Sequence, residues 1–225
     1  MAIIQIQLNK NLYLRDPQET ELGKKMVRTS IEIIDEIGFE KFTFKKLAAA
    51  IESTEASVYR YFENKHRLLV YLIAWYWNWV EYVIDFQTNN IHDPHEKLRI
   101  VIRIITERKM MDPYFPDINE EVLYRIIIAE SDKTYLTKQV DDDNKEGLFR
   151  GYKSLCKKIA GIFRQINPSY RYPHSLASTL LQASHQQVFY SQHLPSLTEM
   201  NFKSRDFNDQ NFTFLYELAM KAIAR

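Results

Sequence analysis

The sequence predicts an all-α protein, with a three-helix head followed by a helical bundle. Only 5 glycines and 7 prolines occur among 225 residues, too few for the many tight turns of a β protein. Apolar residues recur at the helical spacing i, i+3, i+4 and i+7 in segment after segment. A chain of this length, 45% hydrophobic and 26% charged, can bury one large core or two modest ones.

Net charge and cysteine content limit the classes of function that the protein can have. The net charge of +1 gives no general support for nucleic-acid binding. Residues 41–67 nevertheless carry six cations and three anions, a local excess of +3 that suits contact with phosphates. Cys156 is the single cysteine, so one chain can form neither a disulfide nor a cysteine metal site. We expect no metal and no cofactor.

The first eight residues alternate Ile with Gln and lack the apolar core of a signal peptide. No run of 18 uncharged apolar residues occurs, so no segment is expected to span a membrane. We therefore expect a cytoplasmic protein that does not bind membranes.

Residues 42–65 form the most informative stretch, because they predict two very short helices. Phe44, Leu47, Ala48 and Ile51 share one helical face, and Thr43 stands where a hydroxyl can cap the first turn. The polar run 52–54 interrupts this pattern. A second helix follows, in which one set of residues faces inward (Val58, Tyr61, Phe62) and another outward (Ser57, Tyr59, Arg60).

Helices this short are marginal alone and must pack on a larger element. Two short helices joined by a turn of three or four residues are typical of a DNA-binding helix-turn-helix, whose second helix enters the major groove. The outward hydroxyl, phenol and guanidinium groups can bond phosphate oxygens or base edges.

Over roughly residues 21–72 the chain resembles the N-terminal domain of TetR-type transcriptional regulators. The matching residues are Phe42-Thr43, Leu47-Ala48, Ser57-Val58-Tyr59-Arg60-Tyr61-Phe62, Lys65 and Leu68-Leu69. The resemblance implies a homodimer that binds a double-stranded DNA operator, with the last two helices of each subunit forming a four-helix interface. It implies DNA contacts at Thr43, Thr54, Glu55, Ser57, Tyr59, Arg60, Tyr61 and Lys65, of which Tyr59 and Lys65 would bind phosphates and Arg60 a base.

The turn departs from the family pattern, since Glu52-Ser53-Thr54 replaces a common Gly-Val-Ser. Glu52 must either adopt a left-handed conformation, at a cost of about 1 kcal/mol, or form another turn. Glu55 and Ala56 also replace a commonly basic residue and a small one. The alternative function is therefore an all-α ligand-binding or scaffold protein whose helix-turn-helix no longer recognises an operator.

Three regions are expected: an extension (1–18), the helix-turn-helix domain (19–66) and a ligand-binding and dimerisation domain (67–225). In the extension, Ile4, Ile6 and Leu8 alternate with glutamines, a weak strand-like pattern, and we expect a disordered or loosely docked arm. A helix from about Glu19 to Ile37 should complete the head, and Gly38 should end it.

A long helix is expected from Asn64 to about Asp85. Its aromatic residues Trp75, Trp79, Tyr82 and Phe86 fall on one helical face. Two interpretations remain open for them: core packing, or the lining of a cavity for a small apolar or aromatic effector.

Further helices are expected around residues 98–105, 122–127 and 148–166, then at 173–193 and 208–225. The sequence contains no Gly-rich phosphate loop, nucleophile elbow or His-Glu-x-x-His motif, so we do not expect an enzyme. We expect a homodimeric transcriptional regulator, a repressor, with a DNA operator and a small-molecule effector as its partners.

Overall fold

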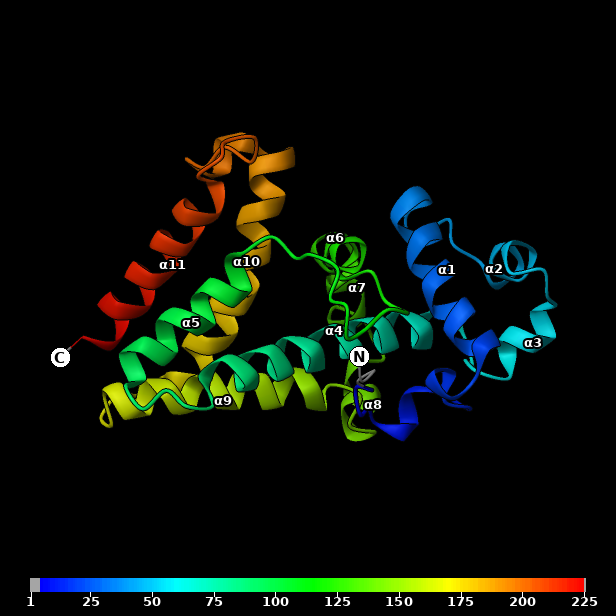
Figure 1. Cartoon of the computed structure of the whole chain (residues 1–225), viewed down its shortest axis with the longest axis horizontal. Helices are drawn as coiled ribbons and strands as arrows, with labels where there is room; N and C mark the ends of the chain where they lie inside the picture. The colour runs from blue at the N-terminus through cyan, green and yellow to red at the C-terminus, as the bar shows by residue number, and fades with distance from the viewer. Residues whose placement is uncertain (1–4, 225) are drawn as a thin grey trace. The chain divides into compact units, whose positions relative to one another are not determined.

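The computed structural model describes residues 5–224, and all regular elements in that range are helical (Figure 1). The all-α prediction is confirmed. None of the described helices is both long and apolar enough to cross a membrane. The α-helices are α1 (Glu21–Ile37), α2 (Phe44–Ala50), α3 (Glu55–Tyr59), α4 (Lys65–Thr88), α5 (Pro94–Thr106), α6 (Glu120–Glu130), α7 (Asp132–Tyr135), α8 (Val140–Lys145), α9 (Arg150–Ile166), α10 (Pro173–His193) and α11 (Phe207–Ile223), and the 3₁₀ turns are η1 (Lys10–Leu12), η2 (Pro17–Glu19) and η3 (Pro195–Leu197).

Contacts divide the chain into two compact units. The first comprises the described residues up to Asn78 together with 109–151, and the second comprises 79–108 together with the described residues from 152 onward. The first unit therefore contains the helix-turn-helix head and also α6, α7 and α8. The domain boundaries expected from the sequence, after residues 18 and 66, stay a prediction.

Helix α1 supplies the largest apolar face of the head. Met26, Ile31 and Ile34 are at most 2% exposed. The Thr20 hydroxyl accepts a hydrogen bond from the Gly23 amide and so caps the first turn. Gly38 ends the helix at φ 78°, a left-handed conformation that glycine adopts without steric cost. The helix and its ending residue were both predicted from the sequence.

The described part of the N-terminal extension is docked, and the expectation of a disordered or loosely docked arm is wrong for residues 5–18. Ile6 and Leu12 are buried. The Asn9 side-chain amide donates to the carbonyl oxygens of Glu146 at 3.0 Å and Gly147 at 2.8 Å. These bonds span more than 130 residues of sequence, so no local pattern could predict them. Ile4 lies outside the described residues.

In the second unit, α10 and α11 pack on each other and both pack on α5. Buried residues of these three helices include Leu98, Val101, Leu180, Leu215 and Ala219.

The aromatic face of α4 is only partly buried. Trp75 and Trp79 are buried, Tyr82 is half-buried, and Phe86 is 75% exposed and stacks on Tyr82. Core packing, one of the two interpretations, is therefore wrong at Phe86. Periodicity shows which residues share a helical face, but not how far along the helix neighbouring elements cover it.

The turn between α2 and α3 places Glu52 in the left-handed conformation, the strained one of the two possibilities. Glu52 has φ 56° and is the non-glycine residue with positive φ among those described. Its amide donates to the Ala49 carbonyl at 3.2 Å, and the Ser53 amide donates to the Ala48 carbonyl at 2.9 Å. This is the Schellman pair of hydrogen bonds, which usually places glycine where Glu52 stands.

Replacing Glu52 by Gly should raise the free energy of unfolding by about 1 kcal/mol, because glycine adopts the left-handed conformation without a Cβ clash. Urea denaturation measures the change. Ala50→Gly, in the last turn of α2, is the control and should lower stability by a similar amount. A destabilised Glu52→Gly protein would show that the glutamate makes a compensating interaction.

Glu120, at the start of α6, is a fully buried carboxyl group. Its Oε2 accepts a hydrogen bond from the Asp112 amide at 3.0 Å, whereas Oε1 has no hydrogen-bond partner among the described residues. Burial raises the pKa of Glu120 from 4.5 to about 7, since a buried carboxylate loses hydration that backbone amides replace only in part.

The folded protein therefore binds a proton more tightly at Glu120 than the unfolded chain does. The free energy of unfolding should fall as the pH rises from about 4.5 to about 7, by at most about 3 kcal/mol, and this decline should be absent in Glu120→Gln. Urea denaturation at several pH values tests it, with the exposed Glu36→Gln as control. A pH profile unchanged in Glu120→Gln would contradict the assignment.

Candidate nucleic-acid interface

Two threonine hydroxyls start the short helices of the head. Thr43 Oγ1 accepts a hydrogen bond from the Lys46 amide, and Thr54 Oγ1 accepts one from the Ser57 amide, each at 3.2 Å. Val58, on the inner side of α3, is fully buried. Helix α3 has only five residues, so its position depends on this cap and this buried contact rather than on its own hydrogen bonds.

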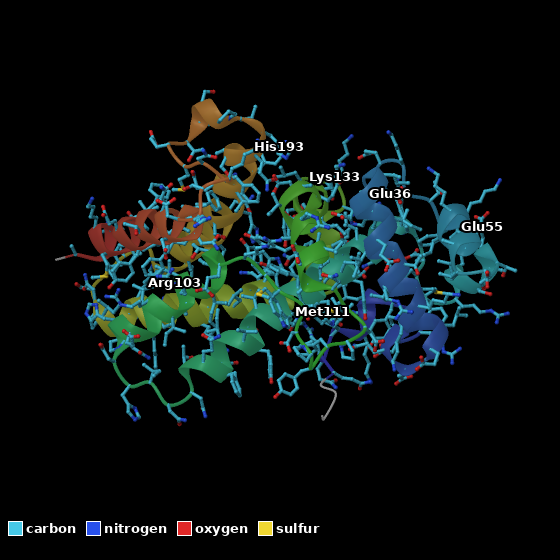
Figure 2. The ribbon with its side chains drawn as sticks, turned by 45° about the horizontal axis from the view of Figure 1, so that its top comes forward. Glu36, Glu55, Arg103, Met111, Lys133 and His193 are labelled. Atoms are coloured by element: carbon cyan, nitrogen blue, oxygen red, sulfur yellow. The ribbon has the colours of Figure 1, made fainter. Side chains whose placement is uncertain are left out.

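The outer side of α3 is exposed. Glu55, Ala56, Tyr59 and Arg60 are all exposed, and Ser57 is half-buried. Figure 2 shows Glu55 at the outer side of the α2–α3 pair. The Tyr59 ring is 50% exposed and packs edge-on against Phe44 with a centroid distance of 5.0 Å. This packing restrains the ring. The end of α3 thus presents two exposed polar groups, the Tyr59 phenol and the guanidinium of the C-cap residue Arg60.

Two further predicted DNA-contact residues, Tyr61 and Lys65, also have structural partners within the head. Tyr61 is 2% exposed, and its hydroxyl lies 2.7 Å from Thr20 Oγ1. The Lys65 ammonium donates to the carbonyl oxygens of Phe39 and Glu40, each at 3.2 Å, and to that of Phe42 at 3.4 Å. Lys65 thereby ties the start of α4 to the loop between α1 and α2, a role that sequence reasoning missed.

The same loop is held from α6. Glu130 Oε1 accepts a hydrogen bond from the buried Phe39 amide at 3.0 Å. Arg125 forms a two-pronged ion pair with Asp35 of α1, with distances of 2.9 Å from Nε and 2.6 Å from Nη2. Such paired contacts fix geometry as well as distance. Helix α6 and the head are therefore fastened at two points.

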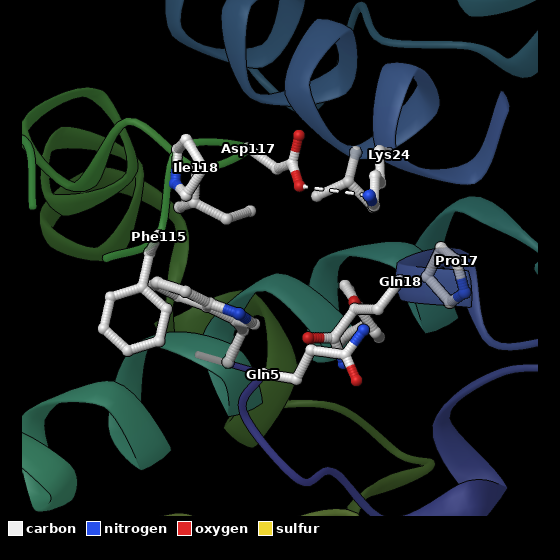
Figure 3. Close-up of a pocket in the computed structure, with 11 residues that line it drawn as sticks. Gln5, Pro17, Gln18, Lys24, Phe115, Asp117 and Ile118 are labelled. Atoms are coloured by element: carbon white, nitrogen blue, oxygen red, sulfur yellow. Dashed lines mark ion pairs between the residues drawn. The ribbon is translucent and has the colours of Figure 1, made fainter. Parts of the chain in front are cut away.

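A small cavity lies in the first unit (Figure 3). Its volume is about 60 Å³. Of the four aromatic residues predicted to bind an effector, Trp75 lines it, and the others do not. The lining residues are Gln5, Pro17, Gln18, Lys24, Val27, Tyr71, Trp75, Phe115, Pro116, Asp117 and Ile118. They come from four separate segments, so no sequence motif marks the site.

Residues 27–72 match the family model described as bacterial regulatory proteins, tetR family. The matched range covers most of α1, all of α2 and α3, and the start of α4. No curated protein matches the sequence.

Solved structures of similar fold extend the likeness beyond the head. A putative TetR-family transcriptional regulator from Syntrophomonas wolfei aligns with a TM-score of 0.63 at 15% identity, covering 92% of this chain and 97% of its own. AibR in complex with isovaleryl coenzyme A and operator DNA aligns with a TM-score of 0.59 at 16% identity, covering 88% and 97%. The ketosteroid transcriptional regulator KstR2 of Mycobacterium tuberculosis gives 0.55 at 12% identity, covering 97% of each.

These identities are low, so the structural likeness shows the fold. The family model adds a sequence match for the head. Residues 27–72 are similar to the tetR-family model, and the chain around them has the all-α fold of the solved TetR-family regulators.

Proposed function

We propose that this protein is a homodimeric DNA-binding transcriptional regulator, a repressor that a small apolar or aromatic effector releases from its operator. The observation that carries the proposal is the exposed face of α3, with Tyr59 and Arg60 beside each other in a tetR-family head. AibR, which shares the fold, was crystallised with operator DNA and an acyl coenzyme A. The proposed role is not enzymatic, and the proposed location is the cytoplasm.

Helix α3 would enter the major groove, with Arg60 positioned to bond a base edge. Tyr59, Thr43 and Ser57 would contact phosphates, which set the register but carry no sequence information. The exposed cations Lys41, Lys45 and Lys46 lie on and before α2 and would add attraction to the phosphate backbone.

The second unit offers a surface for the dimer. Buried residues of α11 face its own unit, including Phe212, Leu215 and Ala219. A second apolar stripe, spaced by four residues, remains open: Phe214 is 43% exposed, and Leu218 and Ala222 are half-buried. A second copy packed on this stripe would bury it and present two heads to successive major grooves about 34 Å apart.

An effector can release DNA only if its affinity differs between the DNA-bound arrangement and another arrangement of the heads. The contacts of α6 with Asp35 and Phe39 provide a physical link, because movement of α6 acts on the end of α1 and on the start of the loop that leads into α2.

Gel-shift titrations with duplex DNA from upstream of the protein's own gene test the proposal. Arg60→Ala should weaken binding by about 1–3 kcal/mol at one base pair and relax the preference there, because a base contact is lost. Tyr59→Phe should weaken binding to all operator variants by similar factors, because it removes a phosphate contact.

The two variants serve as controls for each other, since both residues are exposed on the same short helix. Equal weakening of every sequence by Arg60→Ala would make Arg60 a backbone contact. Equal binding of upstream and scrambled duplexes by the unaltered protein would instead favour the alternative, a ligand-binding or scaffold protein, for which the exposed Glu55 in α3 is the supporting observation.

A further inference from the structure

The cavity in the first unit has the construction of a ligand site. Its walls come from the N-terminal arm (Gln5, Pro17, Gln18), α1 (Lys24, Val27), α4 (Tyr71, Trp75) and the segment 115–118 before α6. The volume of about 60 Å³ exceeds what one water molecule needs several-fold. The cavity also opens to solvent, so a small ligand can extend past the enclosed space.

The inner walls are mainly aromatic and apolar. Trp75 and Phe115 meet edge to face with a centroid distance of 5.5 Å, and Val27 is 3% exposed. Two aromatic planes and a branched aliphatic side chain favour a flat apolar body.

One polar group interrupts this lining. The Tyr71 side chain is 1% exposed, and no hydrogen bond joins its hydroxyl to any described residue. The hydroxyl oxygen is open to the cavity, where water or a ligand can bond it. Burial of the side chain raises the pKa of Tyr71 well above its ordinary value, which keeps the hydroxyl protonated. A ligand with one hydroxyl or carbonyl group would supply a hydrogen-bond partner.

Charges at the mouth of the cavity balance each other. Figure 3 shows Lys24 of α1 and Asp117 of the segment before α6 facing each other, with Nζ 3.8 Å from Oδ2. Lys24 also contacts Glu21 at 3.1 Å. An anionic or cationic ligand would have to break this pairing, so the site favours an uncharged molecule.

We propose that this cavity binds a small uncharged aromatic molecule with one hydrogen-bonding group, whose ring lies among Val27, Trp75 and Phe115 and whose polar group bonds the Tyr71 hydroxyl. The site joins α1 of the head to the segment that leads into α6. A ligand that separates these two walls would strain the Arg125–Asp35 ion pair and so change the arrangement of the helices in the head. This regulatory consequence rests on the proposed function, whereas the binding itself does not.

Ligand-observed NMR titrations of the full-length protein without DNA test the binding. Phenol should bind more tightly than benzoate or benzylammonium, which carry charge. Tyr71→Phe should reduce the affinity for phenol about 2- to 12-fold, the effect of one neutral hydrogen bond, and leave toluene unchanged. Tyr76→Phe is the matched control, because Tyr76 is equally buried on the same helix but does not line the cavity. It should change neither affinity.

A second variant tests the location without removing a polar group. Val27→Ile adds one methyl group to the cavity wall and should weaken both phenol and toluene, whereas Val70→Ile, also buried but outside the cavity, should not. Circular dichroism checks that each variant is folded.

The inference is overturned if phenol binds Tyr71→Phe and Val27→Ile as tightly as the unaltered protein, or if the folded protein binds none of the probes. Because no DNA is present, these outcomes do not depend on operator binding. Conversely, a protein that binds phenol through Tyr71 but ignores its upstream DNA would support the cavity and contradict the proposed function.

Discussion

The loop between α1 and α2 is the constraint on which the head depends. Three backbone carbonyls of residues 39–42 converge on the Lys65 ammonium from α4, and the Phe39 amide is held by Glu130 from α6. A short loop with this many polar backbone groups would otherwise require water or flexibility. With both partners in place, α2 and α3 keep a defined position relative to α1, the start of α4 and α6.

Because of this arrangement, not every predicted DNA-contact residue of the head can be assigned to DNA contact alone. Lys65 is positively charged, but its ammonium already donates three hydrogen bonds to the protein's own backbone. Tyr61 carries a phenol, but its side chain is buried and its hydroxyl already bonds Thr20. Both therefore affect DNA binding at least through the shape of the head. Tyr59 and Arg60 differ, because their exposed surfaces are available to a duplex.

Local sequence patterns were sufficient to predict the helices of the head. The spacing of Phe44, Leu47 and Ile51, the cap at Thr43 and the stop at Gly38 predict structures that depend on neighbours within a few residues, and each is present. The strain at Glu52 was one of two outcomes that the sequence allowed. What the sequence could not predict depends on long-range contact: the docked arm, the exposure of Phe86, the bonds of Lys65, and a cavity assembled from four segments.

The proposed coupling between effector binding and operator binding follows from the arrangement of these elements within the first unit. The cavity wall before α6 leads directly into Glu120, Arg125 and Glu130, and the latter two hold α1 and the loop after it. Buried Glu120 at the start of this path has one oxygen without a hydrogen-bond partner among the described residues, which lowers the local stability of the beginning of α6.

The most direct measurement is sedimentation of the full-length protein with a fluorescent duplex from upstream of its gene, at physiological salt. We predict that the free protein sediments as a dimer and that the complex carries chains in pairs, with a scrambled duplex of equal length bound much more weakly. A monomer, or the same affinity for both duplexes, would contradict it.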